Sequence, residues 1–98
     1  MTRTTQDLKH KLKGLYAITD QHLISETNFS QAIEAALQGG VSIIQYRDKS
    51  DNQDKRFRQA SLLRKICNDH DSICIINDDI ELAQSVDADG VHIGKDDH

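Results

Sequence analysis

Three short polar clusters contain most of the side chains in this sequence that could bind an anion or a metal ion. They occupy residues 45–49 (Gln-Tyr-Arg-Asp-Lys), 77–78 (Asn-Asp) and 95–97 (Lys-Asp-Asp), and each directly follows a short, mainly apolar run. Cations that could hold a phosphate thus recur with carboxylates that could hold a metal ion. Parallel sheets bind ligands at the carboxyl ends of their strands, so the clusters indicate one shared binding site.

The first cluster has the composition of a diphosphate-binding segment. Side chains alternate along a strand, so Gln45, Arg47 and Lys49 should point the same way if strand geometry continues through them. Arginine offers a planar fork to phosphate oxygens, and lysine offers a point charge. A solvated loop in which the two cations pair with Asp48 and Asp51 would have the same sequence, so the pentapeptide alone leaves both interpretations open.

The acidic residues of the other two clusters also have two interpretations. Asp78 or Asp79 could cap a helix that begins near residue 80. Asp96 and Asp97 could cap a helix or face solvent. Together with a substrate phosphate, however, carboxylates from neighbouring strand ends supply the hard oxygen ligands that Mg²⁺ prefers. The residues taken together therefore predict a magnesium-assisted reaction on a diphosphate ester.

The segments between the clusters predict strands and helices in alternation. Apolar runs predict strands at residues 15–19, 41–45, 73–76 and 91–93. Helical spacing of apolar residues predicts helices at 30–38, 51–68 and 80–86, and a short polar helix is possible at 5–13. The longest helix is expected to bury a stripe made of Phe57, Ala60, Leu63 and Cys67, and to expose its basic segment 55–58.

This alternation indicates an α/β fold built from parallel βαβ units. An eight-stranded (β/α)₈ TIM barrel needs ~250 residues. The 98 residues of this chain are therefore expected to form its first half, about four strands, over residues 14–98 after a polar segment at 1–13. The two unpaired sheet edges predict a homo-oligomer if the half-barrel is stable alone.

Composition excludes several classes of partner. The net charge of −4 and the lack of a basic run argue against nucleic-acid binding. No signal peptide is visible and no apolar run reaches about 18 residues, so no membrane partner is expected. Cys67 and Cys74 lack disulfide or zinc spacing, and they are expected to be small buried groups in a cytoplasmic protein.

Four motifs, in the right order, resemble those of the thiamine-phosphate synthase family. They lie at residues 15–20, 39–49, 76–83 and 88–97, so the resemblance extends over nearly the whole chain. It implies a (β/α)₈ barrel transferase of thiamine biosynthesis. Such an enzyme joins hydroxymethylpyrimidine diphosphate to a thiazole phosphate, giving thiamine phosphate and pyrophosphate.

The resemblance also implies roles for individual residues. The pyrimidine diphosphate would be contacted by Gln45, Arg47, Lys49 and Asn77, and Mg²⁺ on the departing pyrophosphate would be held by Asp78 and Asp97. The carbon–oxygen bond to the diphosphate would break first, and the metal and the two cations would stabilise charge growing on the leaving group. No catalytic acid, base or nucleophile is assigned.

This chain also departs from the family pattern. Lys95 and Asp96 stand where the family commonly has glutamine and glutamate. The later strands that would bind the thiazole phosphate are absent from these 98 residues, so the isolated chain is expected to turn over little or nothing. The alternatives are a non-catalytic half-barrel remnant that binds a ligand or itself, and a thiazole tautomerase-like paralogue. The pattern of Gln45, Arg47 and Lys49 together with Asp97 favours the synthase.

Overall fold

Four parallel strands and three helices alternate along the chain in the computed structural model, which describes residues 15–22 and 24–94. The elements are β1 (Leu15–Ile18), α2 (Phe29–Gln38), β2 (Val41–Tyr46), α3 (Gln53–Asp69), β3 (Ile73–Asn77), α4 (Ile80–Ser85) and β4 (Gly90–His92). The strands form one sheet in the order β1-β2-β3-β4. The predicted fold class, parallel βαβ units of the α/β class, is confirmed. The helix predicted at 5–13 lies outside the described residues.

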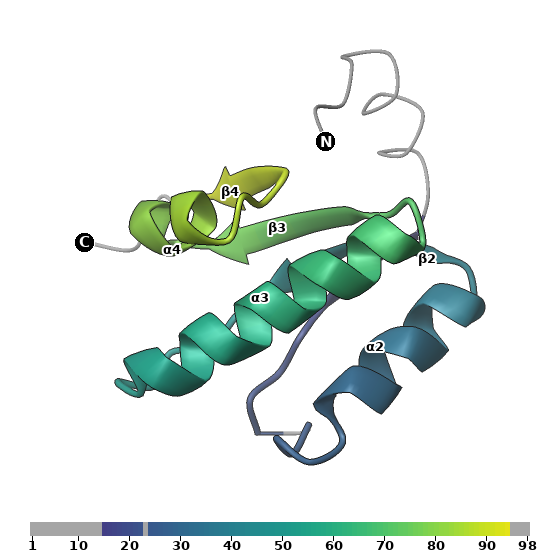
Figure 1. The fold of residues 1–98 in the computed structure, drawn as a ribbon, viewed down its shortest axis with the longest axis horizontal. Coiled ribbons are helices and arrows are strands. Elements are labelled where there is room, and N and C mark those ends of the chain that lie inside the picture. Colours follow the sequence, from purple (N-terminus) through teal and green to yellow (C-terminus); the bar gives the residue numbers. More distant parts are fainter. Residues whose placement is uncertain (1–14, 23, 95–98) are drawn as a thin grey trace.

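The core lies between the sheet and the two longer helices. Helices α2 and α3 cover the same face of the sheet (Figure 1). Ile44 and Ile76 point from the sheet into this core, where they join Ile33 of α2 and Leu63 of α3. Strand side chains alternate between faces, so Gln45, which follows Ile44, lies on the opposite face of the sheet. That face positions the site described below.

The predicted apolar stripe of α3 is wrong at one position. Ala60, Leu63 and Cys67 are buried as expected, but Phe57 is 49% exposed. The buried face of α3 also contains Gln59 and Ile66. At about 100° per residue, Phe57 lies roughly 120° from the centre of that face. A spacing of three residues from Phe57 to Ala60 was therefore not sufficient to place both on one side.

Residues in the connecting loops set where α2 ends and where α3 begins. Gly40 adopts a φ of 109°, which residues with a side chain rarely do, and it turns the chain from α2 directly into β2. At the start of α3, the Asn52 side chain accepts a hydrogen bond from the Lys55 N–H at 3.0 Å.

In the part of the chain that the structure covers, no helix has both the length and the apolar character needed to cross a membrane.

Candidate functional site

The amides of Gln45 and Asn77 meet where β2 and β3 end. The Asn77 Nδ2 donates a hydrogen bond to Gln45 Oε1 at 3.0 Å, and Gln45 Nε2 donates to the Tyr16 hydroxyl at 2.5 Å. Gln45 is only 4% exposed. Two of the predicted substrate-binding residues therefore lie side by side on the sheet face away from the helices, and Tyr16 of β1 fixes the orientation of the Gln45 amide.

Lys49 and Asp78 meet at the same rim. The Lys49 Nζ lies 3.1 Å from Asp78 Oδ2, and the Lys49 side chain is 47% exposed. Asp78 Oδ1 accepts a hydrogen bond from the Gly94 N–H at 2.8 Å, and the Asp78 N–H donates to the His92 carbonyl at 2.7 Å. Asp78 thus joins the ends of β2, β3 and β4 at one point.

The helix cap after β3 is Asp79, so the capping alternative for Asp78 does not apply. Asp79 Oδ1 accepts a hydrogen bond from the Leu82 N–H at 2.9 Å, and its other oxygen lies 2.8 Å from Arg56 Nη2. Asp78 instead has a φ of 54°, in the left-handed region that aspartate tolerates better than most residues. This backbone conformation turns the Asp78 carboxylate toward Lys49 and away from the helix.

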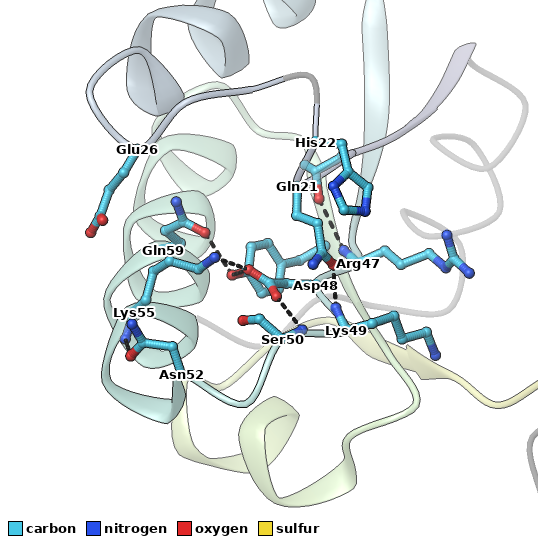
Figure 2. A network of polar contacts seen from close by, with 12 residues as sticks. Gln21, His22, Glu26, Arg47, Asp48, Lys49, Ser50, Asn52, Lys55 and Gln59 are labelled. Carbon is cyan, nitrogen blue, oxygen red and sulfur yellow. Dashed lines mark hydrogen bonds and ion pairs between the residues drawn. The ribbon is translucent and has the colours of Figure 1, made fainter.

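Arg47 and Lys49 extend together, on the side of the segment opposite Asp48 (Figure 2). Their backbones are held by the residues that follow β1. The Arg47 N–H donates to Thr19 Oγ1 at 2.9 Å, and the Lys49 N–H donates to the Gln21 side-chain oxygen. The predicted alternation is therefore present at residues 47–49.

The solvated-loop alternative would pair Asp48 with Arg47 or Lys49, but in the structure Asp48 pairs with Lys55 of α3. Its carboxylate lies 2.7 Å from Lys55 Nζ and accepts the Ser50 N–H at 2.7 Å. Burial would raise the pKa of this carboxyl, but the hydrogen bonds from Lys55 and Ser50 together outweigh burial and lower the pKa to about 2. Asp48 is consequently ionised at any ordinary pH.

The basic segment 55–58 was predicted to be solvated, and this prediction is wrong for its first half. The side chains of Lys55 and Arg56 are 21% and 20% exposed, and they pair with Asp48 and Asp79. Lys55 thus compensates a buried carboxylate after β2, and Arg56 compensates a partly buried carboxylate after β3. The sequence spacing did not reveal either pair. Arg58, which pairs with Glu26, is exposed as expected.

Beside Asp48, Tyr46 completes a buried polar group on the helix side of β2. The Tyr46 hydroxyl donates to Gln59 Oε1 at 2.7 Å and lies 3.3 Å from Asp48 Oδ2. Burial and the neighbouring Asp48 raise the pKa of Tyr46 well above its usual value. A cavity of about 240 Å³ opens next to this group, and Arg47 is the one predicted binding residue that lines it. The cavity is thus separate from the amide and lysine–aspartate contacts.

Sequence reasoning missed the contribution of β1 and the loop after it. Tyr16, Thr19 and Gln21 each hold a residue of the first cluster by a hydrogen bond. One signal was available, namely the polar residues that follow the apolar run at 15–18. It could not identify the contacts, because the register of β1 against β2 cannot be read from the sequence.

Of the two predicted metal ligands, Asp78 is among the described residues. Asp97 lies outside the described residues, together with Lys95 and Asp96. Among residues 15–22 and 24–94, no three His, Cys, Asp or Glu side chains are arranged to hold a metal ion. Asp78 nevertheless offers carboxylate oxygens at the rim, and Mg²⁺ bound with a phosphorylated substrate needs only one or two protein carboxylates. The residues present therefore fit a substrate-bound magnesium ion.

Comparisons with known proteins agree on one family. The family model described as "Thiamine monophosphate synthase" matches residues 15–98. The thiamine-phosphate synthase of Nitrosococcus oceani is 46% identical over 90 residues, which are 92% of this chain and 42% of that protein. The thiamine-phosphate synthase of Thermoplasma acidophilum is 49% identical over 87 residues, 89% of this chain and 40% of that protein.

A solved structure shows the same arrangement of elements. The thiamine phosphate pyrophosphorylase from Pyrococcus furiosus matches with a TM-score of 0.82 and 34% sequence identity, over 93% of this chain and 43% of that chain. The chain thus spans less than half the length of the relatives that it matches. By sequence and by fold, the chain belongs to the thiamine monophosphate synthase family.

Proposed function

We propose that the rim at the carboxyl ends of β1 to β4 is the pyrimidine diphosphate half-site of a thiamine-phosphate synthase. The observation that carries this proposal is the contact between Lys49 and Asp78 at 3.1 Å, beside the pair of amides formed by Gln45 and Asn77. A cation, a carboxylate and two amides from separate strand ends thus converge on one side of the sheet. The relatives, a thiamine-phosphate synthase and a thiamine phosphate pyrophosphorylase among them, support the reaction class.

Each side chain of the rim would have its own role in binding. Gln45 and Asn77 would hydrogen-bond the pyrimidine, and Arg47 and Lys49 would bind the diphosphate and stabilise the charge that grows on it as it leaves. Asp78, with Asp97, would hold Mg²⁺. When bound, Mg²⁺ would neutralise part of the charge on the departing pyrophosphate. The phosphate oxygens would offer the Lys49 ammonium an anionic partner in addition to Asp78.

Completion of the reaction needs a site for the thiazole phosphate. We assign none to residues 15–94, and the chain spans only 40–42% of the curated relatives. A polypeptide of these 98 residues alone would therefore bind the pyrimidine diphosphate without forming thiamine phosphate. Its two cysteines are buried free thiols, which fits a reducing compartment such as the cytoplasm.

Isothermal titration calorimetry tests the half-site. Hydroxymethylpyrimidine diphosphate should bind in the presence of Mg²⁺, and its affinity should fall when the metal is removed with a chelator. Hydroxymethylpyrimidine without the diphosphate serves as the control, and we expect it to bind far more weakly because the cations then have no anion to hold. No measurable heat with the diphosphate would refute the proposal.

Self-association is a second candidate role, favoured by the exposed apolar side chains at the two sheet edges. Leu15 and Ile18 at the β1 edge are 61% and 54% exposed, and Ile93, just after β4, is 55% exposed. We propose that two copies cover these edges to form a homodimer. Sedimentation velocity should then show a dimer whose fraction rises with concentration. A monomer at all concentrations would contradict it, without affecting the half-site.

A further inference from the structure

The turn between β2 and α3 is held from both sides at alternate residues. The N–H groups of Arg47 and Lys49 donate to side chains that follow β1, whereas the Asp48 carboxylate between them points toward α3 (Figure 2). The Asp48 side chain is 2% exposed, and the side chain of its partner Lys55 is 21% exposed. The ion pair therefore has little contact with solvent, unlike the surface pairs that contribute little in most proteins.

The Asp48 carboxylate also fixes the backbone that follows it. Oδ1 accepts the Ser50 N–H at 2.7 Å, and Oδ2 lies 2.7 Å from Lys55 Nζ. Lys55 is itself held, because its N–H donates to the Asn52 cap at the start of α3. The turn at residues 48–55 is thus held together by several contacts, and two of them are made by the Asp48 carboxylate.

We propose that Asp48 is a positioning residue that sets the direction of the Arg47 and Lys49 side chains toward a bound diphosphate. This inference rests on the proposed half-site. Asp48 would not itself contact the diphosphate, because its carboxylate is on the opposite side of the segment from both cations. Its contribution is to hold the backbone so that the two cations reach the rim together, before a ligand arrives.

Electrostatics makes this inference easy to test, because the two possible roles of Asp48 predict opposite signs. A negative charge beside an anion site repels the anion, so a simple charge effect predicts tighter binding when Asp48 is neutralised. If Asp48 positions the cations, its neutralisation should weaken binding, because the Arg47 and Lys49 side chains are then no longer held in directions that reach the same diphosphate. A purely structural role predicts a lower melting temperature and an unchanged dissociation constant wherever the variant is folded.

The experiment measures the affinity of the chain for inorganic pyrophosphate with excess Mg²⁺, by calorimetry, well below each melting temperature. We expect Asp48→Asn to weaken binding roughly tenfold, the size of effect that a lost charge-assisted contact has. Asp69→Asn is the matched control, because Asp69 pairs with Lys65 of the same helix but is 62% exposed. It also removes one negative charge, and we expect a change of no more than about twofold.

Lys55→Met breaks the same ion pair and leaves Asp48 in place, but it also removes a positive charge, so a charge effect and a loss of positioning both predict weaker pyrophosphate binding. The double variant with Asp48→Asn and Lys55→Met keeps the net charge of the wild type. It should bind pyrophosphate about as weakly as Asp48→Asn, because both variants lack the ion pair. An Asp48→Asn protein that binds pyrophosphate as tightly as the wild type, or more tightly, would overturn the inference alone. A wild-type chain that does not bind pyrophosphate would overturn the half-site, and this inference with it.

Discussion

Asp78→Asn should lower the affinity for pyrophosphate in the presence of Mg²⁺ about 100-fold. It should not weaken the magnesium-free binding, because it removes a negative charge that repels the anion. The amide retains an oxygen that can accept the Gly94 N–H, and asparagine tolerates the φ of 54° at this position. What it loses is the negative charge that Mg²⁺ needs. Calorimetric titrations with and without the metal measure both affinities directly.

Asp87→Asn is the control for this variant, because Asp87 has the same φ of 54°. Its side chain is 87% exposed, and its partner is Arg64 rather than any residue of the rim. The substitution therefore tests the backbone conformation and the loss of one charge without touching the site. If Asp78→Asn and Asp87→Asn behave alike, Asp78 is not a metal ligand.

Leu63→Ala should reduce the free energy of unfolding by about 2–5 kcal/mol, the range for truncating a fully buried leucine. Leu63 is 0% exposed and lies in the core cluster that joins α2, α3, α4 and the sheet. Small domains have only about 5–15 kcal/mol of stability in total, so this loss would be a large fraction of it. Urea unfolding followed by circular dichroism measures the difference.

The neighbouring residue provides the control for Leu63. Leu62 is 38% exposed and lies outside the core cluster. We expect Leu62→Ala to cost less than about 1 kcal/mol, because less apolar surface is removed and no buried cavity remains. Equal losses for the two variants would show that α3 does not pack on the sheet through the face described here.

The order of the elements could be predicted because each has a clear period or a continuous apolar run. The run at 73–76 appears as β3, and the helical spacing at 30–38 appears as α2. Phe57 shows where this reasoning fails: in a long helix with scattered apolar residues, several stripes fit the same sequence. Only packing against the sheet decides which of them is buried.

That the polar side chains lie close together could be predicted from a general rule about parallel sheets, and not from any single residue. Parallel strands end at the same edge, so a lysine after β2 and an aspartate after β3 had to lie near each other. The rule does not give the register between strands, and so the hydrogen bond from Gln45 to Tyr16 could not be foreseen. It also does not give the partner of a buried carboxylate, which is why the role of Lys55 appears only in the structure.

The most direct test of this account is an NMR titration of the ¹⁵N-labelled chain with hydroxymethylpyrimidine diphosphate and Mg²⁺. We predict that the largest amide shifts fall at the rim, at Arg47, Lys49, Asp78 and Gly94. The amino ends of the strands, near Gly40 and Ser72, should change little. Shifts concentrated at those amino ends, or an unchanged spectrum, would contradict the claim that the strand ends form a magnesium–diphosphate site.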